Sequence, residues 1–151
     1  MTNNALKISE ACSLAMHAMA MLAGDPEHIF STHQIAGELK GSEAHLSKVM
    51  QRLAKSGFVE AVRGPGGGFR LSGDPDKITL LDIYEVVEGP FSLQRCLLST
   101  PICQGERCVL GGLVEKVNKL VYTQLQKTKI SQLRDVFHRN KIGDSKHSKN
   151  R

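Results

Sequence analysis

Residues 31–72 constrain the fold of this chain more than any other segment, because two predicted helices are followed directly by a predicted hairpin. Ser31 and Gln34 have the spacing of a capping box and open a short predicted helix that extends through Leu39. After a tight turn, Ser42 caps a second predicted helix, whose inner positions recur at helical spacing: Leu46, Val49, Met50 and Leu53. The segment therefore predicts a helix-turn-helix.

A two-stranded wing is predicted directly after the second of these helices. Phe58–Val62 alternates as a strand, residues 63–68 read Arg-Gly-Pro-Gly-Gly-Gly and form a turn, and Phe69–Ser72 returns as a second strand. A helix-turn-helix with a wing is a DNA-binding module in which the second helix presents side chains to the major groove. We therefore expect a mainly α fold with a small β-wing.

Three further helices are predicted outside this segment. Ala5–Ala23 is apolar on almost all sides, and a capping box at Thr79 and Asp82 opens a helix over Leu80–Glu88. From Cys108 onward, apolar residues recur in steps of three and four along a long helix: Leu110, Leu113, Val114, Val117, Leu120 and Val121. The most economical partner for this seam is the same helix of a second subunit. Folding back onto its own domain is the alternative.

The length of 151 residues fits one domain with an appended arm. We expect a winged helix-turn-helix domain over 1–90, a cysteine-rich loop over 91–108, and a dimerisation helix with a C-terminal helix over 109–139. Residues 140–151 form a basic tail with Ile142 as their one apolar residue, and we expect this tail to be disordered.

The net charge of +5 is unevenly distributed along the chain. Residues 40–70 carry six basic and two acidic side chains, and residues 129–151 carry seven basic and two acidic ones. Such patches favour polyanions, with nucleic acid first. The longest apolar stretch, Leu14–Ala23, has about ten residues, short of the roughly 20 that span a bilayer, and no signal peptide is evident. We expect a cytoplasmic protein with no membrane partner.

The predicted DNA contacts lie on the second helix and on the wing. On the helix, four side chains are spaced to form one exposed basic stripe: His45, Lys48, Arg52 and Lys55. Its first two turns carry the residues expected to reach base edges, which are Ser42, Glu43, His45, Ser47 and Lys48. Arg52 and Lys55 are expected to contact phosphate. On the wing we expect minor-groove contacts from Arg63, Gly64, Pro65, Gly66 and Gly67. A solvated helix face is the alternative for the stripe. A phosphate-cradling loop is a weak alternative for the glycines, because no Lys-Ser/Thr pair follows them.

Three of the four cysteines, Cys96, Cys103 and Cys108, fall within thirteen residues. Gaps of six and four residues match neither zinc ribbons nor a thioredoxin-like pair. Clustered thiolates suit zinc or an iron–sulfur cluster, and irregular spacing on a loop favours the cluster. Incidental thiols and a disulfide switch are the other interpretations.

The chain resembles the Rrf-type winged-helix repressors, which include the iron–sulfur cluster assembly regulator and the nitric-oxide-sensitive repressor. The resemblance covers roughly residues 7–133 and rests on LSKVMQRLAKSGFVEAVRGPGGGFRLS, on ITLLDIYEVVEGP and on three cysteines before a long helix. It implies a homodimer crossed through the long helix that binds palindromic promoter sites. It also implies a [2Fe-2S] or [4Fe-4S] cluster on Cys96, Cys103 and Cys108 with one non-cysteine ligand, and minor-groove contacts over residues 63–68.

Two departures from the family pattern concern the cluster. The family's cysteine gaps are commonly five and five, or longer in the first gap, so the cluster type stays open. In several of its sensors a carboxylate or nitrogen ligand completes the site, sometimes from the first helix of the other subunit. The best-aligned position here is Ser13, a poor ligand, and Glu10, Cys12 and His17 are the nearby alternatives.

Together these features predict a homodimeric transcription repressor whose operator affinity is controlled by an iron–sulfur cluster that senses redox state, nitric oxide or iron–sulfur status. Cluster loss would reorder residues 90–107 and change the spacing and tilt of the two recognition helices. The alternative is a cluster-free thiol or zinc sensor, or a partner-binding adaptor, on the same fold. An enzyme is not expected, since no nucleophile is paired with a base and the histidines are scattered.

Overall fold

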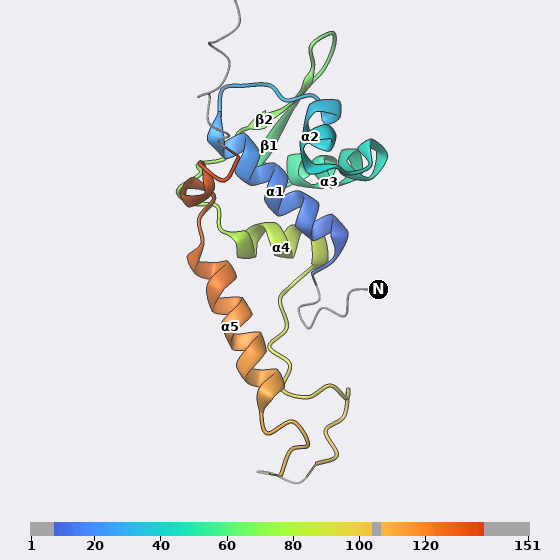
Figure 1. The fold of residues 1–151 in the computed structure, drawn as a ribbon, viewed down its shortest axis with the longest axis vertical. Coiled ribbons are helices and arrows are strands. Elements are labelled where there is room, and N and C mark those ends of the chain that lie inside the picture. Colours follow the sequence, from blue (N-terminus) through green and yellow to red (C-terminus); the bar gives the residue numbers. More distant parts are fainter. Residues whose placement is uncertain (1–7, 104–106, 138–151) are drawn as a thin grey trace, which may run out of the picture.

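The computed structural model describes residues 8–103 and 107–137, which form a mainly helical fold with one small antiparallel sheet (Figure 1). The predicted fold class is confirmed. In chain order the elements are α1 (Glu10–Gly24), α2 (Thr32–Leu39), α3 (Glu43–Lys55), β1 (Val59–Val62), β2 (Gly68–Leu71), α4 (Leu80–Glu88), α5 (Leu113–Lys127) and the 3₁₀ turn η1 (Ile130–Leu133). The predicted basic tail over 140–151 lies outside the described residues.

Side-chain caps fix the helix-turn-helix where the sequence predicts it. The Gln34 amide donates to Ser31 Oγ over 3.1 Å, and the Ser31 amide donates to Gln34 Oε1 over 2.8 Å, which closes the capping box at the start of α2. Lys40 ends α2 in the left-handed conformation, with φ 53° and ψ 37°. Ser42 then caps α3 by accepting from the His45 amide.

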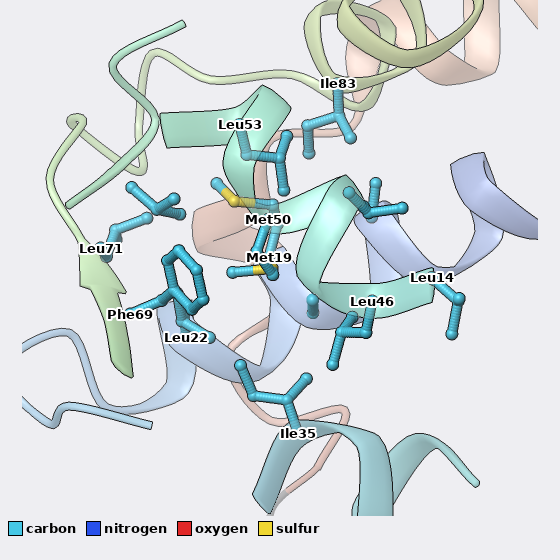
Figure 2. Packing of buried hydrophobic residues seen from close by; sticks show 14 of the residues in the cluster. Leu14, Met19, Leu22, Ile35, Leu46, Met50, Leu53, Phe69, Leu71 and Ile83 are labelled. Atoms are coloured by element: carbon cyan, nitrogen blue, oxygen red, sulfur yellow. The ribbon is translucent and has the colours of Figure 1, made fainter. Parts of the chain in front are cut away.

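Helix α1 is the centre of the hydrophobic core (Figure 2). Met19 and Leu22 are fully buried and lie among side chains from α3, the wing and α4, such as Met50, Phe69 and Ile83. An apolar surface on almost all sides of α1 is what this central position requires. The helix begins later than predicted, because Ser9 caps it by accepting from the Cys12 amide and residues 8 and 9 are not helical.

The wing is joined at its base to the start of the helix-turn-helix. Strands β1 and β2 pair antiparallel, and Phe30 and Phe69 exchange two backbone hydrogen bonds of 2.9 Å. A Cβ atom at Gly68 would lie 2.2 Å from the carbonyl oxygen of Phe30, so only glycine allows this approach. The wing base and the segment that leads into α2 therefore form one unit.

Helix α4 occupies its predicted range, with Thr79 and Asp82 forming the expected capping box. Helix α5 begins at Leu113 rather than near Cys108, because Gly111 and Gly112 both have positive φ and turn the chain just before it. The loop that follows α4 leads away from the body, and α5 runs beside it back toward η1 (Figure 1).

The predicted C-terminal helix is a single 3₁₀ turn, η1, which returns the chain to α1. The Ile130 side chain is fully buried, and its amide donates to the carbonyl of Ile78. Among the described residues, no helix is long and apolar enough to cross a membrane.

Candidate DNA interface and cysteine loop

One side of α3 packs into the core and the other faces solvent. Leu46, Val49, Met50 and Leu53 are buried, as the helical spacing predicts. The predicted base-reading residues on the solvent side are Ser42, Glu43 and Lys48, which are exposed, and Ser47, which is half-buried. Exposed Gln51 and Lys55 extend the same surface toward the end of the helix.

Two residues of the predicted basic stripe also contact neighbouring helices. His45 is 36% exposed at its side chain, and its Nδ1 lies 3.9 Å from Glu10 Oε1 on α1. Arg52 Nη1 donates to the backbone carbonyl of Val87 on α4 over 3.2 Å. Helical spacing correctly groups these positions with Lys48 and Lys55, but α1 and α4 lie along the flank that carries His45 and Arg52. Lys48, Arg52 and Lys55 are exposed and His45 is half-buried, so the basic stripe stays a prediction.

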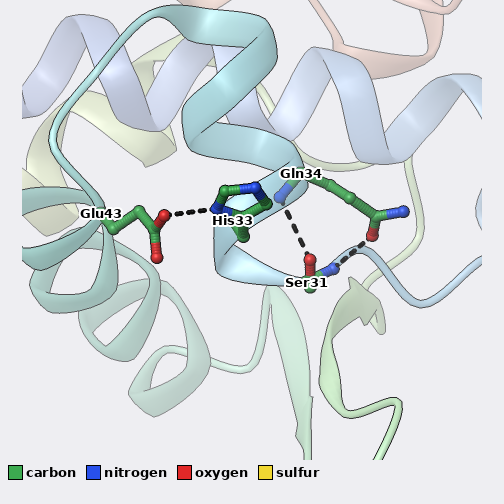
Figure 3. A network of polar contacts seen from close by, with 4 residues as sticks. All are labelled: Ser31, His33, Gln34 and Glu43. Carbon is green, nitrogen blue, oxygen red and sulfur yellow. Dashed lines mark hydrogen bonds and ion pairs between the residues drawn. The ribbon is translucent and has the colours of Figure 1, made fainter.

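His33 contacts the predicted base-reading carboxylate of Glu43 (Figure 3). Its Nδ1 lies 2.5 Å from Glu43 Oε1, and this contact joins the first turn of α2 to the first turn of α3. Both side chains are mainly exposed. His33 was not among the predicted site residues, because it belongs to no sequence motif and lies ten positions before Glu43.

The wing tip is built from glycines because its turn requires them. Gly64 and Gly66 have φ of +96° and +73°, and the Gly67 amide donates to the carbonyl of Gly64 over 2.9 Å. A Cβ atom on Gly67 would lie 2.3 Å from the carbonyl oxygen of Val62. Arg63 and Pro65 are exposed at this tip. The predicted wing contacts thus lie together on a tight, exposed turn.

Backbone amides favour a thiolate at Cys108. The amide of Gly112 lowers the pKa of the Cys108 thiol most, and the amides of Leu110 and Gly111 and the Cys103 thiol add to this effect. Cys96 Sγ accepts from the amide of Leu98 over 3.4 Å. The amides of residues 110–112 lie where the chain turns into α5, and the Cys103 thiol is close enough to Cys108 to lower its pKa.

A complete set of metal ligands does not converge within the described residues, where no three His, Cys, Asp or Glu side chains form a metal-binding group. The donors nevertheless suit an iron–sulfur cluster, whose properties depend on thiolate ligands and on hydrogen bonds to sulfur. By their chemistry, the three cysteine thiols fit an iron–sulfur cluster. The structure does not place the third thiol, that of Cys96, with those of Cys103 and Cys108.

The four candidates for a non-cysteine or additional ligand lie along the first half of α1 in different surroundings. Cys12 is buried, and burial first, then the charge of Glu88, raises the pKa of its thiol to about 11. Ser13 is half-buried, and Glu10 and His17 are exposed. His17 Nδ1 lies 2.6 Å from the carbonyl oxygen of Ser13. Cys12 therefore behaves as a packed thiol, whereas Glu10 and His17 are accessible from outside the subunit.

Helix α5 has two different faces. On one, Asn118 Nδ2 donates to the carbonyl of Gln94 over 2.7 Å, and the Phe91 ring lies 5.5 Å from the Tyr122 ring. On the other, apolar side chains are exposed at helical spacing: Leu113 by 53%, Val117 by 37% and Leu120 by 71%. The first face holds the cysteine loop. The second face is not covered by the described part of the subunit.

Comparison with known protein families matches residues 8–135 to Rrf2, which is described as an iron-dependent transcriptional regulator. The chain belongs to the Rrf2 family. As an Rrf2 member it is a DNA-binding transcriptional regulator and not an enzyme. The family resemblance seen in the sequence is thereby confirmed.

Relatives within the Rrf2 family match over most of the chain. A putative HTH-type transcriptional regulator, BadM of Rhodopseudomonas palustris, is 30% identical over 133 residues, which cover 87% of this chain and 83% of the relative. CymR, the global cysteine regulator of B. subtilis, is 30% identical with a TM-score of 0.68, and the match covers 87% of this chain and 98% of CymR. IscR of T. potens is 26% identical with a TM-score of 0.65, over 97% and 95% of the two chains.

Proposed function

We propose that this Rrf2 member is a homodimeric repressor whose affinity for a palindromic operator depends on an iron–sulfur cluster held by Cys96, Cys103 and Cys108. The observation that carries the proposal is the thiol pair at the start of α5. Backbone amides favour the thiolate of Cys108, and the Cys103 thiol contacts it. A thiolate is the form of cysteine that binds iron.

The cysteine loop connects the proposed cluster site to the DNA-binding elements. When bound, a cluster supplies iron that reacts with oxidants or nitric oxide, and the chain's own residues determine what that reaction changes. Cys96 lies two residues after Gln94, which α5 holds, and Cys108 lies just before α5 begins. Release of the three thiols would free both ends of the loop.

The exposed apolar face of α5 supports the homodimer. Leu113, Val117 and Leu120 repeat at steps of four and three, which is the spacing of a helix-packing seam. A second copy of α5 presents the same seam, so a two-fold axis buries both at once. The two copies of α3 would then read the two halves of a palindrome.

Within each subunit, α3 and the wing tip are the proposed DNA contacts. Ser42, Glu43, Ser47 and Lys48 lie on the first turns of α3, and residues 63–67 lie on the exposed wing turn. His45, which contacts α1, remains in the proposal at the edge of this surface. Arg52, predicted from the sequence to contact phosphate, lies beside it and contacts α4.

Cysteine variants test the cluster. The protein is purified without oxygen and reconstituted with iron and sulfide, and its iron content, visible absorption and operator affinity are measured. Serine at Cys96, Cys103 or Cys108 should abolish the cluster and bring operator affinity to that of the apo-protein. Cys12→Ser is the control and should retain the absorption unless Cys12 is the additional ligand. Full iron content in all three loop variants, or a wild type that never takes up iron and sulfide, would contradict the proposal.

A charged substitution tests the dimer. Leu120→Asp places a carboxylate in the seam, where burial of an unpaired charge costs several kcal/mol, so sedimentation should show a monomer. Gln126→Asp on another exposed face of α5 is the control and should sediment as the wild type does. A folded Leu120→Asp dimer would remove α5 from the interface.

Salt titration tests the DNA contacts. Arg63→Ala should weaken operator binding and lower the slope of log affinity against log salt by about 0.9, the value for one lost phosphate contact. Lys48→Ala should in addition relax the base preference if Lys48 reads a base edge. An unchanged affinity for Arg63→Ala would remove the wing from the interface.

A cluster-free thiol sensor is the second candidate, because the Cys103 and Cys108 thiols are already in contact. This candidate is also compatible with the likeness to CymR, the cysteine regulator of B. subtilis. It predicts colourless protein, two essential cysteines out of three, and a response that thiol reductant reverses. Colour and stoichiometric sulfide after anaerobic purification separate the two candidates.

A further inference from the structure

Arg52 is exposed on α3, and its guanidinium also makes a contact within the fold. Its Nη1 donates to the carbonyl of Val87, the residue before the last in α4. The last four carbonyls of a helix have no amide partner within the helix. A guanidinium at this end also suits the negative pole of the helix dipole. Arg52 therefore links α3 to the C-terminal end of α4.

The same end of α4 is held by the cysteine loop. The Phe91 amide donates to Glu85 Oε1 over 3.1 Å, and the Phe91 ring lies 5.2 Å from the Tyr84 ring on α4. On its other side the ring lies 5.5 Å from Tyr122 on α5. Phe91 thus occupies the point where α4, α5 and the loop meet.

From Phe91 the contacts continue to the first cysteine. Asn118 on α5 holds the carbonyl of Gln94, and Arg95 Nε lies 3.8 Å from Glu115 Oε1. Cys96 is the next residue. A series of contacts therefore runs from Arg52 on α3, through the last turns of α4 and Phe91, to the residues just before Cys96.

Helix α1 holds the same junction from the other side. The Ser9 hydroxyl that caps α1 also donates to Glu88 at the end of α4. Glu10, the next residue, faces His45 on α3. The end of α4 is thus placed between the start of α1 and the flank of α3, so a displacement of this end is opposed by contacts to both helices.

We propose that Arg52 is a positioning residue that couples α3 to the cysteine loop through the end of α4, and that it is not a phosphate contact. The inference rests on the proposed function in taking α3 as the helix that reads DNA. DNA binding at α3 then alters the surroundings of Phe91, and by reciprocity a change in the loop alters the DNA affinity of α3.

The absence of tryptophan from the sequence makes this testable with one reporter. In Phe91→Trp, the only indole lies at the junction. A duplex selected by the wild-type protein from a random-sequence pool is titrated into full-length protein as purified. Binding is followed by anisotropy of the labelled duplex, and the junction by tryptophan emission. We expect binding to shift the emission of Phe91→Trp.

Adding Arg52→Gln to this variant should abolish the emission shift while the duplex still binds with an unchanged salt slope. Arg52→Lys keeps a donor for the Val87 carbonyl and should restore part of the shift, which also covers the case in which Arg52→Gln does not fold. Lys55→Gln is the matched control on the exposed end of α3. It should leave the emission shift intact.

Three outcomes would overturn the inference. A salt slope that falls by about 0.9 in Arg52→Gln with the emission shift retained would make Arg52 a phosphate contact. An emission shift retained with an unchanged slope would place the coupling elsewhere, and a Phe91→Trp protein that binds DNA without any shift would show that no coupling reaches Phe91. If the wild-type protein selects no duplex from the pool, the proposed function itself has failed.

Discussion

The two ends of this subunit use their apolar residues in opposite ways. In the body, α1–α4 with the wing, large apolar side chains are buried around α1. In the arm, residues 91–127, Leu125 is the one large apolar side chain that is buried among those described, and nine others are exposed, including Leu97, Ile102 and Val109. The body buries its large apolar side chains within the subunit. The arm leaves most of its apolar side chains exposed within the subunit.

Under the proposed function, this difference assigns stability to the body and regulation to the arm. The body carries the helix-turn-helix and the wing in a packed core, so it keeps the DNA-binding elements in fixed positions. The arm carries the cysteines and the exposed apolar seam of α5. A signal received by the arm can therefore change its contacts without unfolding the body.

The largest expected effect comes from the body's core. Leu53→Ala removes buried methyl groups from the centre of the fold and should lower the free energy of unfolding by about 2–5 kcal/mol. Urea denaturation followed by circular dichroism measures this change. A loss below about 1 kcal/mol would mean that the core around α1 is less tightly packed than the structure indicates.

The next effect compares one thiol from each region. At pH 8 a thiol with a pKa of about 11 is ionised about 100-fold less than one at the ordinary value of 9.0. Cys108, whose pKa is lowered, should therefore react with iodoacetamide more than 100-fold faster than Cys12. Mass spectrometry of apo-protein alkylated between pH 7 and pH 10 gives both rates.

The same pKa predicts how stability depends on pH. Folded Cys12 keeps its proton up to about pH 11, whereas the unfolded thiol loses it near pH 9.0. Between these values the folded state binds more protons, so this contribution to stability falls as pH rises. Cys12→Ala should show a shallower decline across this window, and equal alkylation rates for the two cysteines would contradict both expectations.

A smaller effect is expected in the arm. Leu120→Ala truncates an exposed side chain of the proposed seam and should raise the dimer dissociation constant about tenfold, as expected for an interface residue worth more than about 1 kcal/mol. Unfolding of the body should be unchanged. Sedimentation equilibrium and urea denaturation measure the two quantities, and a body destabilised as much as by Leu53→Ala would show that α5 packs within its own subunit.

The smallest effect is expected at the exposed contact between α2 and α3. His33→Ala removes the partner of Glu43, and an exposed pair of this kind contributes at most about 0.5 kcal/mol to stability. Operator affinity should change by about twofold, measured by anisotropy. A tenfold change with unaltered stability would instead assign His33 a direct role at the DNA.

Local side-chain chemistry made the body predictable from sequence. The capping boxes at Ser31 and Thr79 set the starts of α2 and α4 at the expected residues, because the cap and its partner lie three residues apart in the chain. The start of α1 was misplaced, since Ser9 was not recognised as its cap. The start of α5 was misplaced because the apolar spacing continues across Gly111 and Gly112. The positive φ of these two glycines ends the helix there, so α5 begins only at Leu113.

The site was less predictable because it depends on contacts between distant segments. Spacing along α3 identified its exposed residues, but it contained no information on α4, which supplies the carbonyl that Arg52 contacts. The pairing of His33 with Glu43 joins two helices and leaves no mark in either one. For the cysteines, the sequence indicated a cluster-binding loop, and the amides that favour a thiolate at Cys108 became visible only with the turn at residues 110–112.

The two backbone hydrogen bonds between Phe30 and Phe69 join the wing base to the segment before α2, and this has a consequence for a bound duplex. The bridge between Phe30 and Phe69 fixes that base, and the Phe30 backbone lies directly against Gly68. We therefore expect the distance between the wing and α3 to stay constant. A duplex held at both points must then supply the bending or groove narrowing itself. The energy of that deformation depends on base steps that no side chain touches. Operators with identical contacted bases should therefore still be ranked by the stiffness of the sequence between them.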